Sequence, residues 1–232
     1  MEGDVGLRDR LIGLDREMLG ECRRIFANAR NTAGRLARYN GLHAEALYHP
    51  PRLAGEIRPG PYGDYILSVG RIESVKRIDL AVQALAHVDR AVRLVVAGDG
   101  TQRANVERLV ETLGLGDRVT FLGAIDDRTL LDLYAGALGV VYAPFDEDFG
   151  YVTLEAFLAH KPVITATDAG GPLEFVEDGV NGAIVAPDPE AVGAAFGRLH
   201  ADRRRTAALG QAGFEKASTV TWHGVVDRLV GA

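Results

Sequence analysis

From residue 65 onward the chain alternates short apolar runs with longer segments of helical pattern, and this alternation restricts the fold more than any other feature. In the helical segments apolar residues recur about every 3.6 positions, as in Ile78, Ala81, Val82 and Leu85. The short runs are apolar throughout, which is typical of a parallel sheet with helices on both faces. The sequence therefore predicts an α/β fold with a doubly wound parallel sheet of about six strands, at residues 65–69, 92–97, 118–121, 138–142, 162–165 and 183–185.

The first 48 residues have a different organisation. Apolar residues from Leu7 to Leu19 indicate an amphipathic helix, and a helix at 32–39 lies between short apolar segments at 25–28 and 45–48. These elements are too few to form a core alone, so we expect a remnant or partner element of another domain. Residues 49–63 contain four prolines and three glycines, which is a linker composition.

Composition excludes several classes of protein. The net charge of −6 argues against a nucleic-acid binder and against a polybasic membrane-surface protein. No apolar run reaches the roughly eighteen residues of a membrane span, and the start of the chain lacks the apolar core of a signal peptide. Cys22 is the only cysteine, so neither an internal disulfide nor a cysteine-based zinc site is expected. We expect a cytoplasmic protein, with peripheral attachment to a membrane left open.

Ligands of an open parallel sheet bind at the carboxyl ends of its strands, and glycine occurs in each of the five loops expected there. Gly98 and Gly100 fit the start of a dinucleotide-binding motif, but Arg103 stands where its third glycine would be. No Gly-Lys-Ser or Gly-Lys-Thr occurs, which leaves nucleotide-triphosphatase chemistry without a phosphate loop. The histidines show no metal-ligand spacing.

Two cations flank the turn after the first strand of the sheet. Arg71 and Lys76 are five residues apart, and a helix is expected to begin near Lys76. Together with the backbone donors of a helix amino terminus, both side chains can reach a diphosphate. The alternative is that both are solvated surface charges.

The segment 146–155 carries the carboxylates Asp146, Glu147, Asp148 and Glu155 around a helix expected to begin near Gly150. Asp148 can act as a helix cap, but Glu155 falls within an apolar helix, where an unpartnered carboxylate is costly to bury. Glu147 and Glu155 are about 12 Å apart if the segment is helical, too far to act on one bond. The order carboxylate, exposed amides, carboxylate suits a sugar, a diphosphate and a ribose. Asp146 and Asp148 also fit a metal-binding Asp-x-Asp, a less favoured alternative.

These residues give the chain a resemblance to a known family. From about residue 64 to 199 it resembles the carboxyl-terminal, donor-binding, Rossmann-like domain of retaining GT-B glycosyltransferases of family 4 (group 1), through the stretches SVGRIESVKRIDLAVQAL, VVAGDG, VTFLGAI, EDFGYVTLEAF and KPVITATDAGGPLEFVEDGVNGAIV. The resemblance implies four parts: an amino-terminal, acceptor-side remnant at 1–48, a linker at 49–63, the nucleotide-sugar donor domain at 64–217, and a helix at 218–232 that packs back toward the amino-terminal part.

The resemblance also implies roles for particular residues. Arg71 and Lys76 would hold the donor diphosphate as the leaving group, Glu147 would bind the donor sugar near the reacting carbon, and Glu155 would bind the ribose hydroxyls. The backbone at Phe149, Gly150, Tyr151 and Val152 would contact the phosphates and the sugar. The loop at Leu122 and Gly123 would contact the nucleobase, and Gly70 and Gly98 are further donor-binding positions.

The implied reaction moves a hexose from a nucleotide-diphospho-sugar, with UDP or GDP undetermined, to an unknown acceptor with retention of configuration and without a metal or cofactor. Because only part of the amino-terminal domain is present, a partner chain that carries the rest is a further expectation. Two alternatives stay open: a nucleotide-sugar epimerase of the same architecture, which would need acid–base side chains near the sugar, and an inactive nucleotide-sugar-binding module.

Overall fold

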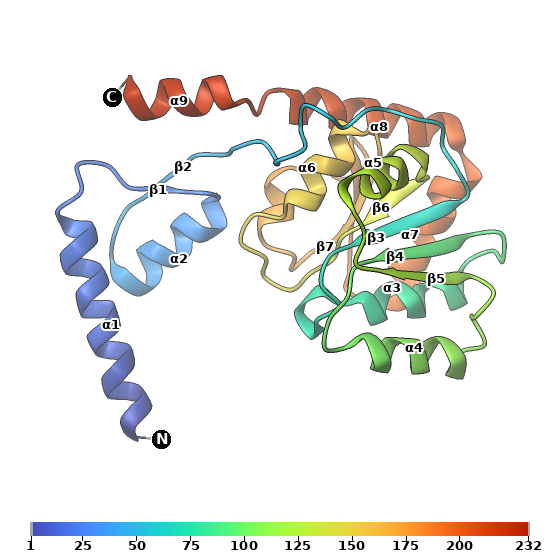
Figure 1. The fold of residues 1–232 in the computed structure, drawn as a ribbon, viewed down its shortest axis with the longest axis horizontal. Helices are drawn as coiled ribbons and strands as arrows, with labels where there is room; N and C mark the ends of the chain where they lie inside the picture. The colour runs from blue at the N-terminus through green and yellow to red at the C-terminus, as the bar shows by residue number, and fades with distance from the viewer. Residues whose placement is uncertain (1, 232) are drawn as a thin grey trace. The chain divides into compact units, whose positions relative to one another are not determined.

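The computed structural model describes residues 2–231, with side chains from residue 6 onward. The chain divides into two compact units, one of residues 1–49 with 222–232 and the other of residues 50–221. The larger unit contains the sheet that the sequence predicts, and the smaller unit contains two short strands and three helices (Figure 1).

The larger unit is built on a six-stranded sheet in the order β5-β4-β3-β6-β7-β8, in which all pairings are parallel. All six predicted strands are confirmed, with ends that differ by at most two residues. They are β3 (Tyr65–Val69), β4 (Arg93–Ala97), β5 (Val119–Gly123), β6 (Gly139–Val141), β7 (Val163–Ala166) and β8 (Gly182–Val185). The α/β class and the parallel six-stranded sheet are therefore as expected.

Helices connect these strands and cover the sheet, with α5, α6 and α8 on one side and α3 and α4 on the other (Figure 1). Asp126 caps α5, because its carboxylate accepts the Thr129 N–H at 2.8 Å. The helical elements of this unit are η1 (Ser74–Lys76), α3 (Ile78–Ala84), η2 (Leu85–His87), α4 (Arg103–Thr112), α5 (Asp127–Gly136), α6 (Tyr151–Leu158), η3 (Gly171–Glu174), α7 (Pro189–Ala201) and α8 (Arg203–Ser218).

The strand order places a topological switch point between β3 and β6. The chain leaves β3 toward β4 and leaves β6 toward β7, so the two connections diverge to opposite ends of the sheet. Such divergence opens a crevice at the carboxyl ends of the two strands. The loops that follow β3 and β6 carry Lys76 and Glu147, so both predicted residues lie at this switch point.

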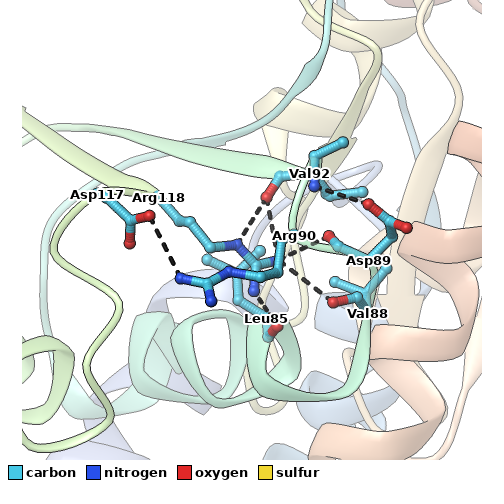
Figure 2. Close-up of polar contacts among 8 residues, drawn as sticks. Leu85, Val88, Asp89, Arg90, Val92, Asp117 and Arg118 are labelled. Atoms are coloured by element: carbon cyan, nitrogen blue, oxygen red, sulfur yellow. Dashed lines mark hydrogen bonds and ion pairs between the residues drawn. The ribbon is translucent and has the colours of Figure 1, made fainter.

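The core contains a buried arginine just before β5. Arg118 is only 6% exposed, and its guanidinium donates to the carbonyl oxygens of Leu85 at 2.8 Å, Asp89 at 3.0 Å and Val92 at 3.0 Å (Figure 2). These carbonyls belong to η2 and to the turn that leads into β4, where the last carbonyls of a helix lack helical partners. Arg118 therefore ties the end of α3 and η2 to the edge strand β5.

A buried lysine lies two residues before β7. Lys161 is fully buried, and its ammonium donates to the carbonyl oxygens of Gly60 at 2.9 Å and Pro61 at 3.1 Å. Its Nζ also lies 4.1 Å from the centre of the Tyr62 ring. These contacts attach the segment that precedes β3 to the rest of the larger unit. Leu53 and Ile57 of the same segment are also buried.

We expect this lysine to make stability depend on pH. Burial lowers the pKa of Lys161 from 10.5 to about 8, so between these values the unfolded chain binds more protons than the folded chain. The free energy of unfolding should therefore rise from pH 8 to pH 10.5, by at most about 3 kcal/mol. Denaturant unfolding at several pH values measures this rise. Lys161→Met should flatten it, and an identical pH dependence in that variant would contradict the assignment.

The smaller unit consists of α1 (Glu2–Gly20), β1 (Phe26–Ala27), α2 (Arg30–Asn40), β2 (Glu45–Ala46) and α9 (Trp222–Val230). β1 and β2 form a parallel two-stranded sheet, and Glu45 binds both Arg24 and Arg228. Leu7, Leu11, Leu14 and Met18 form an apolar stripe along α1, and each is between 46% and 69% exposed. Among the described residues, no helix has both the length and the apolar character needed to cross a membrane.

Candidate functional site

The turn after β3 presents Lys76 at the switch point. Lys76 is the last residue of η1, and Arg77 follows with a left-handed φ of 52°. A helix begins near Lys76, as expected, because α3 starts at Ile78. The left-handed residue Arg77 separates this helix from the single 3-10 turn that ends at Lys76. The amino group of Lys76 therefore extends from a tight turn rather than from the first turn of a helix.

Lys76 forms an ion pair with Glu147, one of the predicted site residues. Its Nζ also lies 3.4 Å from the hydroxyl oxygen of Tyr142, at the end of β6. Tyr142 is buried, and burial raises its pKa, as does the neighbouring Glu147 carboxylate. The phenol therefore stays protonated at neutral pH and lies beside both members of the ion pair.

Backbone hydrogen bonds fix the segment that carries Glu147 between two other loops. On one side Phe145 donates its N–H to Val75 of η1 at 2.8 Å. On the other side Glu147 donates to Ala169 at 2.9 Å and accepts from Gly171 at 2.8 Å. The loops after β3, β6 and β7 are thus joined side by side, which brings Lys76 and Glu147 together from positions 71 residues apart in the sequence.

Glu155 lies inside α6, as the sequence predicts, and the structure supplies the partner that its burial requires. Tyr134 of α5 donates its hydroxyl to Glu155 Oε2 at 2.7 Å. Burial raises the pKa of Glu155, whereas this hydrogen bond and the charge of Arg52 lower it. Tyr134 is 1% exposed, and burial raises its pKa well above the ordinary value, so it remains a hydrogen-bond donor.

The start of α6 lies in the sequence between the two carboxylates. Gly150 precedes the helix with a φ of +82°, and no side chain among the described residues caps it. A Cβ at Gly150 would lie 2.9 Å from Tyr142 Cε1 and 3.0 Å from Pro172 Cγ, so both conformation and space require glycine there. The helix begins at Tyr151, as expected, and its first N–H groups and dipole favour an anion.

The predicted glycines occupy three adjoining turns. Gly70 donates its N–H to Ala97 at 3.0 Å, and Gly98 donates to Gly123 at 2.8 Å. A Cβ at Gly98 would lie 2.0 Å from the carbonyl oxygen of Gly70, so this close approach is possible only for glycine. Leu122 is 39% exposed at the end of β5. Arg71 is exposed, and its charge helps to lower the pKa of Glu73.

The predicted charged residues do not all meet one another. Lys76 binds Glu147, whereas Glu155 binds Tyr134 on the neighbouring helix. The charges of Glu147 and Glu155 both raise the pKa of Tyr142, so the two carboxylates influence the same buried hydroxyl. A cavity of 350 Å³ between α3 and α4 is lined by none of the predicted site residues.

Sequence reasoning missed four residues of this region: Tyr134, Tyr142, Arg77 and Asp168. Arg77 makes a two-pronged ion pair with Asp168, at 2.7 and 2.8 Å, and its guanidinium lies 5.1 Å from the centre of the Phe145 ring. The available signal was position, because Tyr142 ends a strand, Asp168 lies in an expected ligand loop and Arg77 follows Lys76. Within the described part of the chain, no three His, Cys, Asp or Glu residues are grouped to hold a metal ion.

Comparison with known proteins defines the class first through the fold. The structure superposes on HepE from Anabaena, solved with UDP and glucose, with a TM-score of 0.86 at 21% identity, covering 97% of this chain and 65% of that one. It also superposes on sucrose-phosphate synthase from Thermosynechococcus elongatus, with a TM-score of 0.83 at 26% identity, covering 95% of this chain and 60% of that one. The larger unit is a Rossmann-like half of the GT-B architecture.

Sequence comparison then gives the family. Residues 60–216 match the family described as "Glycosyl transferases group 1", and the chain belongs to this family of glycosyltransferases. It is 32% identical to D-inositol 3-phosphate glycosyltransferase from Segniliparus rotundus, over all of this chain and 56% of that protein. It is 34% identical to the human alpha-1,3/1,6-mannosyltransferase ALG2, over 64% of this chain and 39% of that protein. The chain thus spans about half the length of these relatives or less.

Proposed function

We propose that the chain is the donor-binding half of a retaining glycosyltransferase of family 4, which transfers a hexose from a nucleoside diphosphate sugar to an acceptor. The observation that carries this proposal is the contact between Lys76 and Glu147 at the switch point of the sheet, in loops that backbone hydrogen bonds join to each other. A cation near a helix amino terminus suits a diphosphate, and a neighbouring carboxylate suits sugar hydroxyls. The UDP and glucose bound to HepE support this class of donor.

In the proposed reaction the bond between the anomeric carbon and the diphosphate oxygen breaks, and the electron pair leaves with the diphosphate. Lys76, Arg71 and the first N–H groups of α6 stabilise the negative charge that develops on this leaving group. Glu147 holds sugar hydroxyls next to the reacting carbon. The hydroxyl of the acceptor attacks from the side that the diphosphate leaves, which retains the configuration, and its proton passes to the leaving phosphate oxygen. The cations of the chain supply positive charge, so the proposed reaction needs no divalent metal.

The remaining predicted residues bind the rest of the donor. Glu155 accepts hydrogen bonds from the ribose hydroxyls and also keeps the hydrogen bond that it accepts from the Tyr134 hydroxyl. The backbone from Phe149 to Val152 contacts the phosphates and the sugar, and Leu122 and Gly123 contact the nucleobase. Gly70 and Gly98 let the neighbouring backbone approach the donor closely. The contacts that Leu122 and Gly123 make with the base decide between UDP and GDP.

The relatives are about twice as long, and the apolar stripe of α1 is exposed in the smaller unit. We propose that further polypeptide, carried by a partner chain or by another part of a longer protein, covers this stripe and binds the acceptor. A cytoplasmic location remains a prediction from the sequence.

Calorimetric titration with UDP-glucose and GDP-mannose tests the donor proposal. One of the two should bind, and removal of divalent metals with a chelator should leave the affinity unchanged. Binding should also raise the melting temperature, by an amount that grows with the logarithm of ligand concentration. A chain that binds neither nucleotide sugar, nor UDP or GDP alone, would contradict the proposal.

Incubation of the donor without an acceptor separates the alternatives. Epimerised nucleotide sugar, detected by NMR, would favour the epimerase. When the acceptor-side polypeptide is supplied, a transferase should give a glycoside with the anomeric configuration of the donor. Donor binding without any transfer under those conditions would identify an inactive binding module.

A further inference from the structure

Three of the loops in the proposed donor site follow β3, β6 and β7, and a single arginine connects the first of these three to the last. The loop after β3 contacts the loop after β6 through Phe145 N–H and the Val75 carbonyl, at 2.8 Å. The loop after β6 contacts the loop after β7 through Asp146 N–H and the Asp168 carbonyl, at 2.9 Å. Arg77 reaches across all three, because its guanidinium covers the Phe145 ring and binds the Asp168 carboxylate with two nitrogens.

The left-handed backbone of Arg77 indicates that its side chain has a structural role. Its φ of 52° is positive, and only three non-glycine residues in the described part of the chain, including Arg77, have a positive φ. Glycine adopts this conformation without a steric penalty, whereas a residue with a Cβ does not. The side chain at this position thus carries a cost that the ion pair with Asp168 and the contact with Phe145 offset. Because its side chain is 23% exposed and that of Asp168 is 34% exposed, the pair is partly shielded from solvent.

The ion pair between Arg77 and Asp168 lies next to the residues of the proposed donor site. Arg77 directly follows Lys76, and Phe145 lies two residues before Glu147. Arg77 holds the pKa of the Asp168 carboxyl below its ordinary value, so the pair is charged on both sides at neutral pH. Loss of the pair removes the side-chain connection between the turn of Lys76 and the loop after β7, which supports Glu147. The Lys76–Glu147 ion pair and the backbone hydrogen bonds remain.

We propose that Arg77 and Asp168 are positioning residues, which clamp the three loops so that Lys76 and Glu147 meet the donor in a fixed arrangement. This role presupposes the donor site proposed above. Neither residue needs to touch the donor, since each acts through the segments that carry Lys76 and Glu147. A clamp of this kind should affect donor affinity more than folding stability, because preorganised groups bind a ligand without first having to be ordered.

The test uses Arg77→Gly and Asp168→Asn, with affinity for UDP and GDP measured by calorimetry and stability measured by thermal unfolding. Arg77→Gly removes the clamp but gives the backbone the residue that its φ favours, so the melting temperature should stay the same or rise while affinity falls about tenfold. Asp168→Asn should weaken binding to a similar extent. Asp132→Asn, which removes the exposed ion pair between Arg128 and Asp132, is the matched control and should change neither quantity.

A charge exchange completes the test. Arg77→Asp alone should weaken binding further, since it places two carboxylates together, and the double variant R77D/D168R should recover part of the loss. Asp tolerates the left-handed conformation, so the exchange does not add strain at position 77. Affinities of Arg77→Gly and Asp168→Asn within twofold of the wild type, together with lost binding in Lys76→Ala, would overturn the clamp and leave the donor site intact. A wild-type chain that binds neither nucleotide would overturn both.

Discussion

Replacing Glu155 by glutamine should weaken donor nucleotide binding by about tenfold to a hundredfold, and replacing Lys76 by alanine should weaken it at least as much. Hydrogen bonds to a charged group contribute about 1.5–3 kcal/mol each, and about 1.4 kcal/mol corresponds to a factor of ten in affinity. Glu155→Gln keeps an oxygen that can accept the Tyr134 hydroxyl, so the contact between α5 and α6 should persist. Lys76→Ala removes the cation and leaves Glu147 without this partner next to the diphosphate.

Titration with a nucleoside and its diphosphate separates the two roles. Loss of Lys76 should weaken binding of UDP or GDP but not of uridine or guanosine, because the lysine is proposed to contact only the diphosphate. Loss of the Glu155 charge should weaken binding of nucleoside and nucleotide alike, because both contain the ribose. Circular dichroism and thermal unfolding check that each variant is folded. Wild-type affinity in both variants would remove these residues from the donor site, whatever the family of the chain.

The sequence predicts the sheet well because the signal for its strands is local. The central strands β3, β6 and β7 are short, mostly apolar runs that are buried on both faces, which makes them distinct from the helices between them. The start of α6 at Gly150 and the cap at Asp126 are predictable for the same reason, since the residue types needed for these conformations stand at those positions.

The contacts of the site are less predictable, because they join residues far apart in the sequence. Glu155 indicates that a buried carboxylate needs a partner, but nothing near it identifies Tyr134, 21 residues earlier on another helix. The pair of Arg77 with Asp168 spans 91 residues. Arg77 also adopts a backbone conformation that its residue type does not suggest, so the break between Lys76 and the start of α3 is not predictable from the local sequence. For both Glu155 and Arg77, the tertiary fold determines the partner, which the neighbouring sequence does not identify.

The largest effect on stability is expected at Arg118. Arg118→Met keeps most of the aliphatic length of the side chain but removes the N–H groups that bind the carbonyls of Leu85, Asp89 and Val92. A buried polar group left without its partner costs about 1–3 kcal/mol, and this loss is partly offset because a charge no longer has to be buried. We expect the free energy of unfolding to fall by about 3 kcal/mol, which corresponds to roughly 6–12 °C in the melting temperature of a domain of this size.

Arg90 provides the control, because it lies in the same region and differs in burial (Figure 2). Its side chain is 83% exposed, and its ion pair with Asp117 is 3.6 Å long, so Arg90→Met should change the free energy of unfolding by less than about 0.5 kcal/mol. Arg118→Lys should fall between the two, since one ammonium reaches fewer carbonyls than a guanidinium. Equal stability of Arg118→Met and the wild type, measured by denaturant unfolding, would mean that water replaces the guanidinium at these carbonyls. In that case the connection between η2 and β5 would depend on apolar packing alone.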